Sequence, residues 1–465
     1  MAMIAPTVDS VGDAALTDSI IDKSITELQD DIVTALKAPA LYGCTALKKV
    51  AFGSVTSVAA NVFQNCTALE VADFHQAVAI KSGAFTGCTA LSALILRSTE
   101  KCTITSSAGL GSTGRIVEET CRELMAQGHT CRIAYGRGTS GCEGIETYSI
   151  GSARDYALHA ALNRVTDRHG CYSHGATRKF LEWVRDYDPD VIWLHNVHGY
   201  YLNLPLLFDY LRGCGKELRW TLHDCWAFTG HCAYFDYVGC ARWKTGCHHC
   251  PQKGSYPASM VLDGSKANYA MKKRLFTGIP NLTLIVPSHW LERRVKESFL
   301  KDYPVKVVYN TVDREVFRPR PGDFREKYGL ANKKILLGVA NVWEPRKGLG
   351  DFLELAALLD GEYKIVLVGL SEQQIRELPN TILGLPRTKN AVELAEIYTA
   401  ADVYLNPSVE ETFGMTALEA QCCGTPSVVY EDTACEEVAR EFGGMVCKRG
   451  AEHLYQAVKT LLGEE

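Results

Sequence analysis

The chain has 465 residues, 46% of them hydrophobic and 22% charged, which excludes a disordered polymer and predicts about three globular domains. Its 49 basic and 54 acidic residues leave a net charge of -5, so there is no electrostatic basis for general nucleic-acid binding. The 18 cysteines are too sparse for a disulfide scaffold and favour a reduced thiol pool or a metal site.

The N-terminal region lacks the pattern of a secretory signal. Met1–Leu16 has no positive n-region and no apolar segment of signal-peptide length. The longest apolar stretches, such as 335–340 and 365–370, are far shorter than the roughly 20 residues that span a bilayer. We therefore expect a cytoplasmic protein, including one that works at the inner face of the membrane. Amphipathic spacing over 1–38 predicts a helical cap or an N-terminal extension.

Three segments then repeat with a period of 22 residues: Tyr42-Gly-Cys44-Thr-Ala-Leu47, Phe63-Gln-Asn-Cys66-Thr-Ala-Leu69 and Phe85-Thr-Gly-Cys88-Thr-Ala-Leu91. A unit this short cannot close its own core, so stacked copies over 39–100 predict a solenoid. Strands are expected at 50–52 and 71–74, with a turn at 77–81. One thiol per repeat cannot gather four metal ligands, so the repeated cysteines are predicted to pack in the core.

The repeat resembles the leucine-rich repeats of bacterial surface proteins and phage-encoded proteins. The resemblance implies a binding surface and a protein partner for it.

From Gly109 onward, short apolar strands alternate with amphipathic helices, which predicts parallel sheets covered by helices. The break at Pro319-Arg-Pro321-Gly322 divides the series into two doubly wound, Rossmann-like domains, 101–315 and 316–465. The strands are expected at 130–134, 191–194, 218–222, 282–286, 305–309, 334–340, 363–368, 403–406 and 427–430. Ligands of such sheets bind at the carboxyl ends of the strands.

The turn Gly109-Leu-Gly111-Ser-Thr-Gly114 has the spacing of a dinucleotide fingerprint. The strand before it, 101–107, is polar, and no acidic residue occurs over 125–142 to bind a ribose. We therefore expect no nicotinamide cofactor. The turn still offers N–H groups to a phosphate where it enters a helix expected over 115–127.

The second domain carries Pro407-Ser-Val-Glu-Glu411-Thr-Phe413-Gly414-Met415, followed by Glu419 and Gly424-Thr-Pro426. A strand ends here and a helix begins near Met415. The free N–H groups at a helix start suit a diphosphate, and a carboxylate can accept two hydrogen bonds from a vicinal diol such as ribose.

At these residues the chain resembles the retaining family 4 glycosyltransferases of the GT-B fold, which use nucleotide sugars. The family's E-x7-E element matches Glu411 and Glu419, and its basic motif matches Asn341–Gly348. The segment 195–201 and the region of His223 are most similar to enzymes of the colanic-acid and exopolysaccharide type. The resemblance spans about 106–462.

The resemblance implies transfer of a sugar, with retention, from a nucleoside diphosphate sugar to a carbohydrate or lipid-linked acceptor, and peripheral membrane association. It implies catalytic roles for His223 and Glu411. Donor contacts would come from Gly111, Gly114, Arg115, Arg346, Lys347, Phe413, Gly414, Met415 and Glu419. For His195 and His198, a structural role and a functional one both stay open.

Three features depart from the family pattern. Trp343 stands where the family carries an arginine, so Arg346 must substitute for it; the first strand is polar; and little of the family's terminal helix follows Leu462. These departures leave a second interpretation open, a non-catalytic, repeat-bearing binding protein with a degenerate transferase body.

The spacing Cys232-x7-Cys240-x6-Cys247-x2-Cys250 predicts a structural zinc site with four thiolate ligands. Free thiols and two disulfides are the alternatives. Further candidate ligands are Cys225, His231, His248 and His249.

Overall fold

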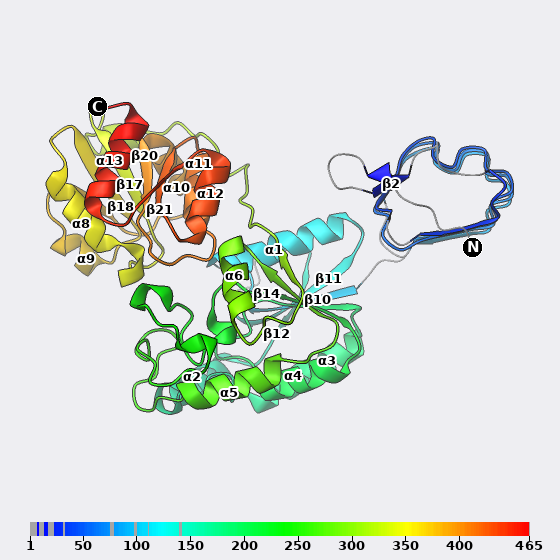
Figure 1. Cartoon of the computed structure of the whole chain (residues 1–465), viewed down its shortest axis with the longest axis horizontal. Helices are drawn as coiled ribbons and strands as arrows, with labels where there is room; N and C mark the ends of the chain where they lie inside the picture. Colours follow the sequence, from blue (N-terminus) through cyan, green and yellow to red (C-terminus); the bar gives the residue numbers. More distant parts are fainter. Residues whose placement is uncertain are drawn as a thin grey trace. The chain divides into compact units, whose positions relative to one another are not determined.

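The computed structural model describes residues 7–8, 14–16, 23–30, 33–74, 79–96, 100–109, 111–138 and 142–464. The chain divides into two compact units, 1–150 with 179–193 and 151–178 with 194–465 (Figure 1). Within the described ranges, no helix combines the length and apolar character needed to cross a membrane.

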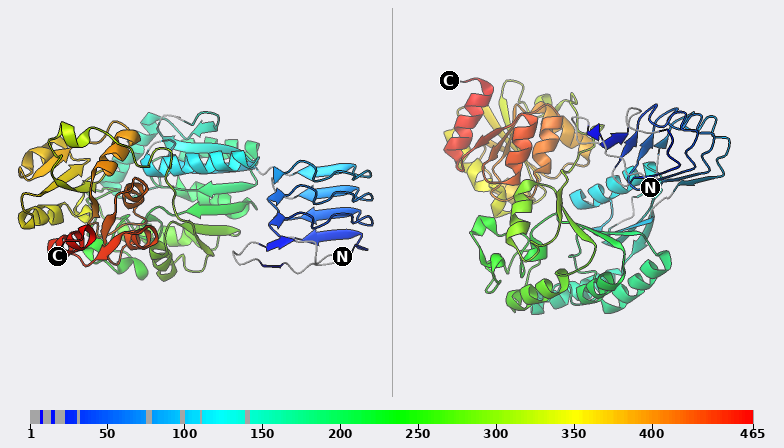
Figure 2. Two further views of the ribbon diagram at one scale, coloured as in Figure 1. Left: turned by 90° about the horizontal axis from the view of Figure 1, so that it is seen from above. Right: turned by 45° about the vertical axis from the view of Figure 1, so that its right-hand side comes forward.

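The first unit begins with a solenoid of two ladders, parallel except for one antiparallel pair at the N-terminal end, whose stacked turns are seen side-on in Figure 2. One ladder contains β3 (Glu27–Asp30), β5 (Lys49–Phe52), β7 (Val71–Phe74) and β9 (Ala93–Leu96). The other contains β1 (Thr7–Val8), β2 (Ala14–Leu16), β4 (Ala35–Leu36), β6 (Ser57–Val58) and β8 (Ala79–Ile80). The predicted solenoid is confirmed.

The repeated cysteines do pack in the solenoid. Cys44 and Cys66 are buried and Cys88 is half-buried. The Cys66 thiol donates to the carbonyl of Leu41, and the Cys88 thiol donates to that of Phe63, each over 3.0 Å. Each thiol therefore ties its own turn to the turn before it.

Two expectations for this region are wrong. The helical cap over 1–38 is replaced, in the described part of that range, by strands: β3 pairs with β5 and β4 pairs with β6, so the repeat begins earlier than 39. The expected turn at 77–81 contains β8, which pairs with β6; 77–78 lie outside the described residues. Both stretches take the strand positions of a repeat: Leu28 and Leu36 are buried in the solenoid core, and the half-buried Ile80 packs against it.

The first unit continues with an α/β segment in which β12 (Glu146–Ser149), β11 (Thr130–Arg137), β10 (Glu100–Ser107) and β13 (Val191–Leu194) are neighbours in that order. Polar as it is, β10 is an inner strand, and Thr103 and Thr105 are buried. Both hydroxyls have partners: Thr105 donates to the Ser107 carbonyl over 3.2 Å, and Thr103 Oγ1 lies 3.6 Å from Cys121 Sγ. The strand is followed by α1 (Gly111–Ala126), which begins earlier than predicted.

The second unit holds β14 (Glu217–Thr221), β15 (Leu282–Val286) and β16 (Val305–Val307), which pair in parallel. The helices of this part are α2 (Ala153–Thr166), α4 (Leu204–Gly213), α5 (Ser265–Phe276) and α6 (His289–Glu297), and α3 (His174–Tyr187) spans both units. A long loop, 223–264, joins β14 to α5 and carries the cysteine motif.

The C-terminal part of this unit is a six-stranded parallel sheet in the order β19-β18-β17-β20-β21-β22. Its strands are β17 (Lys334–Val339), β18 (Tyr363–Val368), β19 (Ile382–Leu385), β20 (Val403–Asn406), β21 (Ser427–Tyr430) and β22 (Met445–Cys447). The helices are α7 (Phe324–Lys327), α8 (Leu349–Leu358), α9 (Glu372–Glu377), α10 (Ala391–Ala400), α11 (Met415–Cys422), α12 (Ala434–Phe442) and α13 (Ala451–Leu462). Separate apolar cores lie on the two faces, so this sheet is doubly wound, as predicted.

Candidate active site

Three charged residues meet where the loops after β17 and β20 come together. Lys347, at the end of the short helix η5 (Pro345–Lys347), forms an ion pair with Glu411. Arg346 Nη1 lies 3.8 Å from the other oxygen of the same carboxylate. Burial alone would raise the pKa of Glu411, but Lys347 and Arg346 outweigh it and hold that pKa below its usual value. Glu411 is therefore ionised between two cations.

The start of α11 lies directly after this carboxylate. Gly414 has φ 101°, and a Cβ there would lie 2.7 Å from Cys435 Sγ, so only glycine fits without a shift. No side chain caps the helix, which leaves the N–H groups of its first turn to a ligand. Glu419, one turn inside, is buried and accepts a hydrogen bond from Tyr398 over 3.0 Å. Phe413 packs into the core beside it.

His223 lies in the loop after β14, and its backbone is hydrogen-bonded to the segment that carries Glu411. Thr412, next to Glu411, donates its hydroxyl to the His223 carbonyl over 2.8 Å. The structure thus brings together His223, Glu411, Arg346 and Lys347 from three segments that are far apart in sequence.

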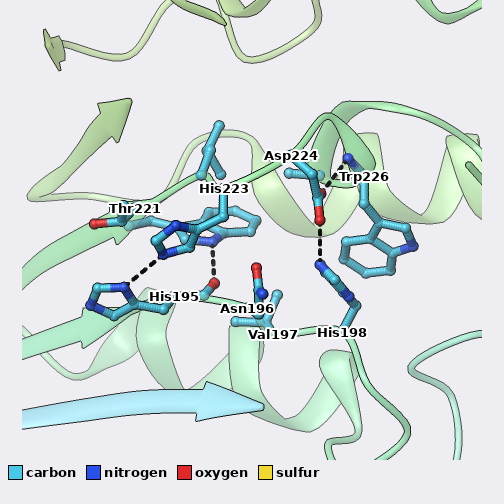
Figure 3. A pocket seen from close by; sticks show the side chains of 11 residues that line it. His195, Asn196, Val197, His198, Thr221, His223, Asp224 and Trp226 are labelled. Carbon is cyan, nitrogen blue, oxygen red and sulfur yellow. Dashed lines mark hydrogen bonds and ion pairs between the residues drawn. The ribbon is translucent and has the colours of Figure 1, made fainter. Parts of the chain in front are cut away.

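A pocket opens beside His223 (Figure 3). Its lining residues are His195, Asn196, Val197, His198, Trp220, Thr221, Leu222, His223, Asp224, Trp226 and Ala227. His195 Nδ1 and His223 Nε2 share a hydrogen bond of 2.9 Å. Burial lowers the pKa of His223 to about 4 and that of His195 well below its usual value, so both imidazoles are neutral near pH 7.

The second histidine of the motif forms a polar chain at the other side of the pocket. His198 Nε2 lies 3.0 Å from Asp224, and His198 Nδ1 lies 3.1 Å from the Tyr256 hydroxyl. Burial raises the pKa of Asp224, but His198 outweighs burial and the net pKa is lowered. This hydrogen-bonded chain includes Tyr256, which spacing in the sequence could not have indicated.

Gly111, Gly114 and Arg115 lie in the first turn of α1, in the first unit. A Cβ at Gly114 would lie 3.1 Å from the Ser107 carbonyl oxygen, so glycine permits close packing of the helix on the β10 turn. Arg115 is exposed.

Trp343 packs in the core and donates its indole N–H to the Val368 carbonyl over 3.0 Å. Trp343 is therefore a structural residue. Arg346 and Lys347 are the two cations next to Glu411.

The structure does not show the predicted four-cysteine zinc site. All 18 cysteines are free thiols, and no group of three or more His, Cys, Asp or Glu side chains in the described part of the chain could hold a metal ion. Cys232 interacts most strongly with Cys250, and Cys247 and Cys240 also act on its thiol electrostatically, so that together with burial they raise the pKa of Cys232.

Comparison with known families assigns the parts of the chain. Residues 113–316 match the family described as glycosyltransferase family 4, and 322–465 match glycosyl transferases group 1. Residues 4–112 match six copies of the BspA-type leucine-rich repeat.

Among known proteins, the chain is 30% identical over 184 residues to a protein of Escherichia coli (strain K12) named for colanic acid biosynthesis as glycosyl transferase WcaC. This covers 36% of the chain and 42% of that protein. A GDP-mannose-dependent phosphatidylinositol dimannoside mannosyltransferase of Mycobacterium tuberculosis is 29% identical over 161 residues, 32% of the chain and 42% of the relative. The matches thus span less than half of these relatives.

Two solved structures extend the likeness at the level of fold. Sucrose-phosphate synthase of Thermosynechococcus elongatus superimposes with a TM-score of 0.57 at 16% identity, covering 78% of the chain and 90% of that protein. Anabaena Alr3699/HepE, solved with UDP, gives 0.54 at 15% identity over 78% and 90%. Residues 113–465 therefore belong to the GT-B glycosyltransferases of family 4 and group 1, and BspA-type leucine-rich repeats precede them.

Proposed function

We propose that the protein is a retaining glycosyltransferase that moves a sugar from a nucleoside diphosphate sugar to an acceptor hydroxyl in polysaccharide or glycolipid biosynthesis. The observation that carries this proposal is the meeting of Lys347, Arg346 and Glu411 with the loop of His223. The names of the relatives, and the UDP bound by the Anabaena protein, point the same way. The acceptor side would be 101–315 and the donor side 316–465.

The barrier in such a transfer is charge separation, because the departing diphosphate gathers negative charge. Lys347, Arg346 and the first turn of α11 at Met415 would stabilise that charge, and the resemblance implies Arg115 as a further cation. Glu411 would contact the donor sugar and Glu419 the ribose. The neutral His223 would hold a sugar hydroxyl near the reacting carbon.

The test is donor hydrolysis and transfer measured over a panel of nucleotide sugars with purified full chain. Lys347→Ala and Glu419→Ala should each lower turnover by about 100-fold or more, which is the cost typical of losing a transition-state contact. Lys364→Ala, a control on β18 that bonds the Asn380 carbonyl instead, should leave turnover unchanged. Undiminished turnover in either site variant would refute the assignment. A wild type that neither turns over nor binds any donor would favour the non-catalytic binding protein.

We also propose that the protein works at the cytoplasmic face of a membrane on a lipid-linked acceptor. The most exposed large apolar residue, Met260, is 77% exposed, and its neighbours Val261 and Leu262 are also exposed. Backbone hydrogen bonds attach this segment to the end of α2, where Val165 is exposed beside Arg164. An apolar patch next to basic side chains suits an anionic bilayer.

Vesicles of anionic lipid should pull down the wild type, and Met260→Ser with Leu262→Ser should abolish the binding. Equal binding by the variant, or none by the wild type, would remove the membrane proposal without touching the donor site.

A structural zinc ion, which we propose from the motif spacing, would require the four thiols to close around it. The Cys232–Cys250 pair already supplies two of them, and Cys247 packs against Gly230, close to Cys232. Zinc near one equivalent in purified protein would support the site, and less than a tenth of an equivalent would refute it.

A further inference from the structure

One short segment of the cysteine loop contacts the charged cluster directly. The backbone N–H of Phe235 donates to Glu410 Oε1 over 2.8 Å, and those of Asp236 and Tyr237 donate to Oε2 over 2.9 and 3.2 Å. Glu410 is fully buried and is the immediate neighbour of Glu411. A side chain more than 170 residues away in sequence thus fixes this segment beside the donor carboxylate.

These three hydrogen bonds need a carboxylate. Burial raises the pKa of Glu410 to about 7, while the N–H groups of Phe235 and Tyr237 favour the charged form. A glutamine has a single acceptor oxygen and would turn its own N–H₂ toward one of the backbone donors, so it cannot replace both oxygens.

The same segment supports Arg346. The guanidinium carbon of Arg346 lies 3.7 Å from the centre of the Tyr234 ring, and Arg346 Nη1 donates to the Glu410 carbonyl over 3.0 Å. Only 8% of Arg346 is exposed. The Tyr234 ring, the Glu410 carbonyl and the Glu411 carboxylate together hold the Arg346 guanidinium in one orientation. The outer end of the segment is anchored by the 2.6 Å ion pair of Asp236 with Arg294 on α6.

We propose that Tyr234 and Glu410 are positioning residues of the donor site: Glu410 holds the segment 234–237 against the loop after β20, and the Tyr234 ring orients Arg346 toward the donor diphosphate. This inference rests on the proposed function. A cation held in place before the reaction stabilises a diphosphate better than a mobile one, because no reorganisation accompanies the developing charge.

The experiment measures binding of UDP, GDP and ADP, together with kcat and KM for donor hydrolysis, in four variants of the full chain. Tyr234→Leu and Glu410→Gln should each weaken binding of the preferred diphosphate about tenfold. Tyr234→Phe keeps the ring face and should recover binding to within about twofold. The matched control is Glu437→Gln, since Glu437 likewise accepts backbone N–H groups, those of His289 and Trp290 at 2.8 and 2.6 Å, but at the start of α6 and not on the segment 234–237.

A double-mutant cycle separates positioning from general loosening. Arg346→Lys should weaken binding in the wild type but add little in the Tyr234→Leu background, because the oriented guanidinium is already lost. Additive losses, or an equal loss in Glu437→Gln, would overturn the inference, as would unchanged binding in both Tyr234→Leu and Glu410→Gln. If Tyr234→Leu does not fold, the comparison of diphosphate binding by Glu410→Gln with that by Glu437→Gln still tests the inference. A wild type that binds none of the three diphosphates would instead overturn the proposed function, and this inference with it.

Discussion

His223, a half-buried side chain at the pocket, links the stability of the protein to the pH of the solution. In the folded chain the pKa of His223 is about 4, below the usual value of 6.5. Between these two pH values the unfolded chain binds a proton at His223 that the folded chain does not bind. Stability from this group is complete above pH 6.5 and is lost as the pH falls toward 4, by up to about 3 kcal/mol.

We therefore expect His223→Asn to flatten the fall in melting temperature between pH 7 and pH 4.5. His453→Asn, which removes an exposed histidine, should leave the slope of the wild type. Parallel slopes for His223→Asn and wild type would contradict the buried neutral imidazole.

Among elements, the solenoid turn is held by its cysteine. Cys66 is fully buried and Cys88 is half-buried, although both thiols make the same hydrogen bond to the turn before. Replacing Cys66 by Ala should destabilise the solenoid by about 1–2 kcal/mol, and the same change at Cys88 by less, because less buried volume is lost. Urea unfolding followed by limited proteolysis within 33–96 checks the order, and a larger effect at Cys88 would contradict it.

The elements also show what the sequence could predict. Five expected strands of the α/β body, 191–194, 282–286, 363–368, 403–406 and 427–430, agree with β13, β15, β18, β20 and β21 to the residue. They have continuous apolar character because both faces of the sheet are covered. The strands of this body that the sequence did not indicate, β12, β19 and β22, lie at sheet ends, where half-buried side chains leave no such pattern.

In the candidate site, Lys347, Arg346 and Glu411 could be named from motifs, and the structure brings them together. Glu410 and Tyr234 could not, since their contacts join separate segments and follow no spacing rule. The four-cysteine spacing is equally regular, but the structure does not show a metal group there, so the zinc site stays a prediction.

For the whole molecule, donor binding should be visible as stabilisation of one part only. A ligand at 100 times its dissociation constant adds about 2.7 kcal/mol to the domain that binds it. We expect the preferred nucleotide sugar to raise one calorimetric transition, that of the α/β body, while the solenoid transition stays in place. No nicotinamide cofactor should shift either. A shift confined to the solenoid, or one caused by a nicotinamide, would place the ligand site elsewhere.

The parallel ladders of the solenoid have a consequence for how the chain is made. From β3 and β4 onward, each strand pair of the solenoid joins residues 22 apart, as Lys49 pairs with Val71, so the loop to be closed is short and the same at each of these turns. In the C-terminal sheet, by contrast, Leu336 on β17 pairs with Val403 on β20, so this pairing cannot form until the segment between them has been made. The solenoid can therefore grow turn by turn as the chain leaves the ribosome, and its first turns are complete before the catalytic sheets have all their strands.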